Sequence, residues 1–208
     1  MSELKKSVWI AAITRGHNAG VCLLKDGEIV FSIEEERITR QKYDGGPFAT
    51  MLRILDYTPK LDYLVIAHTS PQATAGFIDF SGEPVYTGFA RKLGLIDRKA
   101  DRMNHPQVID LSHIHHKLHA ACAFYRSGFS DAVAVIVDGA GTFLDLHTQA
   151  DVVTGWETES IFDCSYPANF SPLYKHIGVK DPHPGAIIKN FPGDRYSEKT
   201  THEARIGD

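Results

Sequence analysis

Short apolar runs alternate with glycine-containing polar turns over the first 35 residues of the chain. The apolar runs cover residues 8–13, 21–24 and 29–33. Asp26-Gly27 separates the second run from the third, and this dipeptide favours a two-residue hairpin because a type I′ turn needs positive φ angles. The pattern therefore predicts that the chain begins with a three-stranded antiparallel meander.

Beyond residue 35, segments with helical spacing alternate with apolar runs typical of strands. The expected helices span 48–57 and 114–126, and the expected strands span 63–67, 107–111, 132–138, 151–157 and 159–164. Residues 71–106 have weak periodicity and are interpreted as an insertion or a loop-rich helix pair. After residue 165, five prolines interrupt any regular pattern.

This order of elements predicts an α/β fold with a mixed sheet. A meander followed by α/β crossovers is also the order of the actin-like, ribonuclease-H-like half-domains of the actin and sugar-kinase superfamily. We expect residues 1–165 to form such a half-domain. Residues 166–208 are expected to be an irregular segment that starts an incomplete second half.

The composition narrows the class of protein. With 208 residues, of which 43% are hydrophobic, the chain can bury a substantial core. Its net charge of −4 and the absence of a Lys/Arg block argue against direct nucleic-acid binding. Three scattered cysteines predict no disulfide framework, and no apolar run approaches the roughly 18 residues of a membrane span. We therefore expect a cytoplasmic protein with no membrane partner.

Four histidines crowd the start of the second expected helix, between residues 113 and 119. His115 and His119 are four residues apart, which places them on one helical face, and Asp138 at the end of the next strand could supply a third ligand. Two imidazoles and a carboxylate with open positions suit iron(II), zinc or manganese. The alternative is that these histidines are structural or simply exposed.

The other two histidines of the cluster, His113 and His116, point elsewhere on a helix. We expect them to act behind the ligands or against a substrate. Zinc proteases with the same two-histidine spacing carry a glutamate directly after the first histidine, and His116 occupies that position here. A hydrolytic zinc protease is therefore disfavoured.

Further candidates lie in two turns and one charged run. Gly139 and Gly141 follow Asp138 and would let backbone N–H groups approach a phosphate, although many such turns are ordinary hairpins. His17, in the first turn, could be a general base or a phosphate donor, and a surface role is equally compatible with this stretch. Arg40 and Lys42, beyond the charged run 34–37, could meet an anionic ligand.

Three blocks together resemble the O-carbamoyltransferase family, whose members carbamoylate Nod factors, cephalosporins and aminoglycosides. The first block comprises residues 16–19 (GHNA) and 24–30 (LKDGEIV), and the second comprises residues 34–42 (EEERITRQK). The third comprises residues 115–125 (HHKLHAACAFY), 127–129 (SGF) and 137–139 (VDG). The blocks occur in order over roughly the first 140 residues, which makes the resemblance specific.

The resemblance implies an actin-like domain related to the ATPases that make threonylcarbamoyl-tRNA. In this family a separate C-terminal domain makes carbamoyl-adenylate from carbamoyl phosphate and ATP, and the actin-like domain passes the carbamoyl group to a substrate hydroxyl. His115, His119 and Asp138 match metal ligands of the family, in which a further Asp ligand comes from well downstream, and iron(II) is the leading metal. His17 matches its active-site histidine, and Gly139 and Gly141 match its nucleotide-side loop.

The chain also departs from the family pattern. Asn18 stands where the family usually has aspartate, and the expected Gly-Lys-x-Met-Gly-Leu-Ala stretch is not found after residue 165. At less than half a full family member, the chain is expected to be a fragment, a split gene product completed by a C-terminal half in trans, or a degenerate paralogue, and to self-associate or bind that partner. A non-catalytic metal-binding regulatory domain and a stand-alone metal hydrolase remain alternatives.

Overall fold

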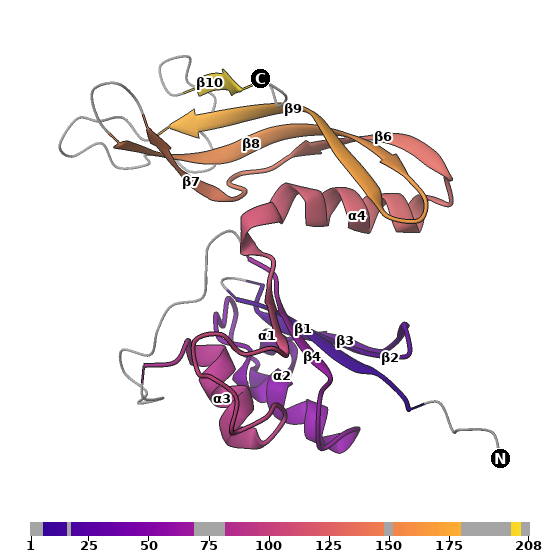
Figure 1. The fold of residues 1–208 in the computed structure, drawn as a ribbon, viewed down its shortest axis with the longest axis vertical. Helices are drawn as coiled ribbons and strands as arrows, with labels where there is room; N and C mark the ends of the chain where they lie inside the picture. The colour runs from indigo at the N-terminus through magenta and orange to yellow at the C-terminus, as the bar shows by residue number, and fades with distance from the viewer. Residues whose placement is uncertain (1–5, 16–17, 69–81, 148–151, 180–200, 205–208) are drawn as a thin grey trace. The chain divides into compact units, whose positions relative to one another are not determined.

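The protein, described by a computed structural model, is a mixed α/β chain that divides into two compact units. The structure describes residues 6–15, 18–68, 82–147, 152–179 and 201–204. The first unit is Met1–Leu111 and the second is Ser112–Asp208. Each unit has its own five-stranded sheet (Figure 1).

The first sheet begins with the antiparallel meander that the sequence predicts. Its strands are β1 (Trp9–Thr14), β2 (Gly20–Lys25), β3 (Glu28–Glu34), β4 (Tyr63–Ile66) and β5 (Val108–Asp110), in the order β3-β2-β1-β4-β5. β1, β2 and β3 pair antiparallel, whereas β1–β4 and β4–β5 are parallel. Asp26 and Gly27 both have positive φ (53° and 91°), as a type I′ hairpin requires.

The described part of the first unit also contains four helical segments. They are α1 (Glu35–Thr39), α2 (Phe48–Leu52), the 3₁₀ helix η1 (Arg53–Asp56) and α3 (Val85–Leu93), of which the last three contribute side chains to the core of the unit. The expected helix over 48–57 is therefore confirmed as α2 followed by η1. α3 is the helix of the segment expected to be loop-rich, and residues 69–81 of that segment lie outside the described residues.

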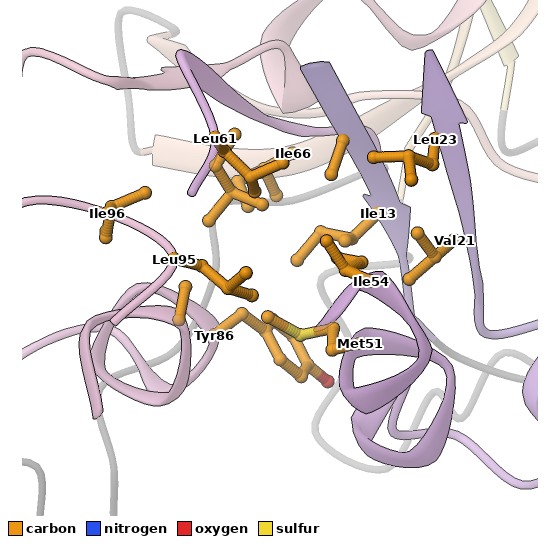
Figure 2. Packing of buried hydrophobic residues seen from close by; sticks show 13 residues of the cluster. Ile13, Val21, Leu23, Met51, Ile54, Leu61, Ile66, Tyr86, Leu95 and Ile96 are labelled. Carbon is orange, nitrogen blue, oxygen red and sulfur yellow. The ribbon is translucent and has the colours of Figure 1, made fainter. Parts of the chain in front are cut away.

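The core of the first unit lies between the strands and these helices. The side chains of Ile13, Val21 and Leu23 alternate along β1 and β2 toward Met51 and Ile54 of α2 and η1 (Figure 2). All five are nearly inaccessible to solvent, and burying a side chain of this size contributes about 1.5–3 kcal/mol. Within the apolar runs that predict β1 and β2, every second side chain thus contributes to the core.

A buried carboxylate connects the meander to α2. Glu35 accepts hydrogen bonds from the N–H groups of Ala49 (2.7 Å) and Thr50 (2.8 Å) and from the Thr50 hydroxyl (2.7 Å). It satisfies the free N–H groups that begin a helix, where a negative charge is also favourable. A run of charged residues such as 34–37 is ordinarily solvated, but Glu35 is only 2% exposed.

The second unit is a helix packed on an antiparallel sheet. After the 3₁₀ helix η2 (Ser112–Ile114), it contains α4 (His115–Ser127), β6 (Asp131–Val137), β7 (Phe143–His147), β8 (Val152–Ser165), β9 (Asn169–Val179) and β10 (Thr201–Ala204). The strand order is β10-β9-β8-β6, and β7 also pairs with β8. Ala120 and Phe124 of α4 pack against Ile136, Phe162 and Cys164, so α4 lies along one face of the sheet (Figure 1).

Two expectations for this region are corrected. The strands expected at 151–157 and 159–164 are one strand, β8, with a register irregularity between Glu157 and Glu159. Residues 169–179, expected to be irregular, form β9, because Pro167 falls in the turn after β8 and Pro172 lies at a second irregularity in the β8–β9 pairing. The expected boundary at residue 165 is the end of β8, whereas the chain divides after Leu111.

The helices of the described segments are too short or too polar to cross a membrane.

Candidate metal centre

The candidate site lies at the break between β6 and β7, two strands that pair with the same neighbour, β8. β6 pairs with residues 159–165 of β8, and β7 pairs with residues 152–156 of the same strand. Residues 138–142, here called the Asp138 bulge, therefore lie opposite only Glu157 and Thr158. Asp138 N–H bonds to the Thr158 carbonyl (2.9 Å) and Gly141 N–H to the Glu157 carbonyl (2.7 Å). The bulge thus stays hydrogen-bonded to β8 at both of its ends.

The first turn of α4 is fastened to this bulge by Thr142. The Thr142 hydroxyl accepts a hydrogen bond from the His115 N–H (3.1 Å) and donates one to the Ser112 carbonyl (3.1 Å). Ile114, at the helix N-cap, has no side chain that can cap, so Thr142 supplies the missing acceptor from another element. These two hydrogen bonds fix the position of the helix that bears the histidines relative to the loop that bears Asp138.

Three side chains converge where these elements meet. His115 Nε2 lies 3.1 Å from Asp138 Oδ2, and His119 Nε2 lies 3.0 Å from His115 Nε2 and 3.5 Å from Asp138 Oδ2. Ligands about 2.0–2.2 Å from a divalent ion, at angles of roughly 90–110°, are about 3.0–3.5 Å apart. The donor set and its spacing therefore fit a divalent metal.

One side of this group is open to solvent. The side chains of His115 and Asp138 are 21% and 29% exposed, and that of His119 is 51% exposed. Three protein ligands with an accessible side leave coordination positions for water or a substrate, as in catalytic rather than structural metal sites.

The carboxylate of Asp138 is held ionised by its surroundings. Hydrogen bonds with His115 and His119 keep the pKa of Asp138 far below its usual range, and the Gly139 N–H, 2.6 Å from Oδ1, adds to the effect. An ionised carboxylate beside two imidazoles is the form that binds a cation.

His116 lies beneath the three side chains and is fully buried. Its Nδ1 is 2.7 Å from the Ser160 hydroxyl of β8, and its Nε2 is 3.9 Å from Asp138 Oδ2. Burial lowers the pKa of His116 to about 4, and the neighbouring Asp138 charge opposes this effect only in part. His116 is therefore neutral at physiological pH.

A buried ion pair between β8 and β9 contacts the Asp138 bulge. Glu157, 1% exposed, accepts a hydrogen bond from the Thr142 N–H (3.1 Å) and forms an ion pair with Lys175 of β9. The predicted site residues do not include Thr142, Glu157, Ser160 or Lys175. For Ser160 the sequence offers one signal, the alternation along its strand. Ser160 falls on the same side as the apolar residues Phe162 and Cys164, so a buried hydroxyl is expected there.

The structure brings together part of the predicted site. His115, His119 and Asp138 meet as expected, and they are the group of potential metal ligands found among the described residues. The N–H groups of Gly139 and Gly141 are already engaged, by Asp138 and Glu157 respectively, so their role as a nucleotide-side loop stays a prediction.

The other predicted residues belong to the first unit. Lys42 forms an ion pair with Glu36 (2.8 Å), and Arg40, with φ of 63°, ends α1. Gly16 and His17 lie outside the described residues. Asn18, next to them in the first turn, lines a cavity of about 600 Å³ together with Thr14.

Comparisons with known proteins add one relative and no family assignment. No family model matches the chain. It is 28% identical over 149 residues to the uncharacterized protein sll1178 of Synechocystis sp., a match that covers 60% of this chain and 24% of the relative. The matched region thus spans about a quarter of the relative's length.

Proposed function

We propose that this chain is the N-terminal, metal-binding part of an O-carbamoyltransferase, which transfers a carbamoyl group from carbamoyl-adenylate to a hydroxyl group of a small molecule. The observation that carries the proposal is the convergence of His115, His119 and Asp138 at metal-ligand spacing with one side exposed. Iron(II) is the first choice of metal, with zinc and manganese as alternatives, since two imidazoles and a carboxylate suit all three.

The topology of the first sheet supports the actin-like, ribonuclease-H-like assignment. Three antiparallel strands come first in the chain, and β4 and β5 then add in parallel beyond β1, in the order β3-β2-β1-β4-β5. This arrangement follows from a meander whose later strands arrive through helical crossovers. It is the arrangement that the resemblance predicts.

The proposed transfer needs a group that activates the carbamoyl carbonyl and a base for the acceptor hydroxyl. A bound divalent metal would polarise the carbamoyl carbonyl. Asp138, held ionised, and the imidazoles of His115 and His119 would hold the metal in place. The exposed side near His119 would admit the carbamoyl-adenylate. His17 would accept the proton of the acceptor hydroxyl.

The remaining parts of the reaction are assigned to a partner. Carbamoyl-adenylate would come from ATP and carbamoyl phosphate in a C-terminal carbamoyltransferase half supplied in trans. An apolar strip on β6 supports a partner or self-association: Val133, Val135 and Val137 are each more than 60% exposed.

The test starts with the purified chain, loaded separately with iron(II), zinc and manganese and analysed for bound metal. A His115→Ala/His119→Ala variant is the comparison, and AMP release from synthetic carbamoyl-adenylate is then followed with a panel of hydroxyl acceptors.

One metal per chain, lost in the variant, and acceptor-dependent AMP release support the proposal. Metal binding without AMP release, even with the C-terminal half of a carbamoyltransferase added, favours a non-catalytic metal-binding domain. Absence of metal in the wild type overturns the proposal.

A further inference from the structure

His116 has a hydrogen-bonding group that the described structure leaves without a partner. Its side chain is 0% exposed, and Nδ1 lies 2.7 Å from the Ser160 hydroxyl. Nε2 is buried and makes no hydrogen bond within the described segments. Leaving a buried polar group without a partner is unfavourable, which points to a partner that Nε2 gains when the site is filled.

The surroundings of Nε2 point to Asp138 as that partner. Asp138 Oδ2 is 3.9 Å away, beyond hydrogen-bond range but close enough for a small side-chain rotation to close the gap. On its other side Nε2 lies against Gly141, where an added Cβ would come within 2.4 Å. The ring is therefore confined between Ser160, Gly141 and the carboxylate.

The charge on Asp138 decides which ring nitrogen carries the proton. If the Ser160 hydroxyl donates to Nδ1, the proton is on Nε2 and an N–H dipole faces the carboxylate. If Nδ1 donates to Ser160 instead, a lone pair on Nε2 faces the carboxylate and repels it. The first arrangement is favoured, and Ser160 is then the group that fixes the tautomer.

We propose that His116 is a positioning residue that donates a hydrogen bond from Nε2–H to Asp138 Oδ2 when the site is filled. Without metal, His115 and His119 both bond to Oδ2. Once these imidazoles turn to an ion, both lone pairs of Oδ2 are released, so that Oδ2 can bind the ion with one and accept a hydrogen bond from His116 with the other. The inference rests on the metal centre of the proposed function, and it is independent of carbamoyl transfer.

A competing role for His116 is that of a fourth ligand through Nε2. That role requires a lone pair on Nε2 and therefore a proton on Nδ1, which is the opposite tautomer. The two roles are distinguished by the position of a single proton.

Long-range ¹H–¹⁵N NMR of the full chain reads that proton directly. Eleven histidines contribute signals, and a His116→Gln variant identifies those of His116. The proposal expects a protonated Nε2 both without and with zinc, and an Nε2–H resonance that moves downfield and exchanges more slowly once zinc is added. A proton on Nδ1, or an Nε2 signal typical of zinc coordination, overturns it.

Zinc affinity, measured by competition with a chelator, provides the second readout. His116→Leu should weaken zinc binding by about 10–100-fold, the usual effect of losing a hydrogen bond to a metal ligand. His116→Gln should recover most of that loss because its amide N–H can reach the same carboxylate. The zinc affinity of Ser160→Ala should lie between those of the His116→Leu and His116→Gln variants. His176→Gln, on the neighbouring strand β9, is the matched control and should bind like the wild type.

Thermal unfolding of each metal-free variant checks that it is folded. Wild-type affinity in a folded His116→Leu variant overturns the proposal, as does failure of His116→Gln to recover affinity. If the wild type binds no zinc, both this inference and the metal centre fail. If zinc binds but no carbamoyl transfer is found, only the transferase assignment fails.

Discussion

Three histidines of one helix surround a single carboxylate, yet their environments differ widely. His119 is half exposed, His115 is mostly covered, and His116 is fully buried. Helical periodicity predicts which of them share a face, because that depends only on local spacing. Helical periodicity does not predict that His116 contacts Gly141 and Ser160, because those contacts depend on how β8 aligns with the bulge.

The space beside His116 makes a clear prediction for Gly141. In a Gly141→Ala variant, the new Cβ would lie 2.4 Å from His116 Nε2 and 2.8 Å from Glu157 Cβ, so the ring and the strand must shift. We expect a loss of about 1–3 kcal/mol in the free energy of unfolding, as for other overpacked interiors, and weaker zinc binding. Urea denaturation measures the first and chelator competition the second.

The control for this prediction is Ala140→Ser, one position earlier in the same bulge, where the side chain is partly exposed. It should change both quantities little. Equal losses in the two variants would show that the bulge is simply intolerant of substitution.

The buried His116 also predicts a pH dependence of stability in the metal-free protein. Its pKa is lowered, mainly by burial, to about 4, whereas an unfolded chain has a histidine pKa near 6.5. Between these values the unfolded chain binds a proton that the folded chain does not. The free energy of unfolding should therefore fall as pH decreases from about 6.5 to about 4, by up to about 3 kcal/mol.

Denaturation curves at several pH values test this dependence. His116→Gln removes the titrating group and should flatten the profile over the same interval. A variant profile parallel to that of the wild type would assign the pH dependence to other groups.

At the scale of elements, the run 34–36 shows what composition alone cannot decide. Three consecutive glutamates look alike in the sequence, but Glu35 turns inward to bind the first N–H groups of α2, while Glu34 stays 43% exposed. The strands of the meander can be predicted because short apolar runs and turn chemistry are local signals. The buried member of a charge run was not, because its partners at Ala49 and Thr50 are 14 and 15 residues away.

The link between α4 and the Asp138 bulge supplies a prediction at this scale. Thr142→Val removes the hydroxyl that accepts from His115 N–H and donates to the Ser112 carbonyl, with little change in shape. We expect a loss of about 1–2 kcal/mol, comparable to that of a helix N-cap, and weaker metal binding because His115 begins the loosened turn.

Thr142→Ser is the matched control, since it keeps the hydroxyl and loses only a methyl group. It should retain metal affinity, as measured by isothermal titration calorimetry. Loss of affinity in the serine variant equal to that in the valine variant would implicate packing of the methyl group in place of the hydrogen bonds.

At the scale of the whole molecule, the ligands belong entirely to one unit. His115, His119 and Asp138 all follow Leu111, where the chain divides. Prolines after residue 165 predict the end of regular structure and a domain boundary at that position. Strand pairing between β8 and β9 overrides that local signal, and such pairing is not visible in hydrophobic periodicity alone.

This confinement predicts a localised response to metal. Zinc should slow amide hydrogen exchange in α4 and the Asp138 bulge, because an ion that joins His115 and His119 to Asp138 raises the free energy of local opening. Exchange in β1 and β4 of the first unit should stay unchanged. Mass spectrometry of peptides from the whole chain, with and without zinc, makes the comparison, and the His115→Ala/His119→Ala variant should show no zinc effect in any peptide.

The break between β6 and β7 has a further consequence, for how the chain tolerates changes in length. A residue inserted within β6 would slide the pairing by one position and turn every following side chain to the opposite face of the sheet. An insertion at Ala140 would be absorbed locally, because β7 takes its alignment from β8 independently of β6. The loop that carries the carboxylate is therefore the one stretch between residues 131 and 147 whose length can vary without reordering the sheet.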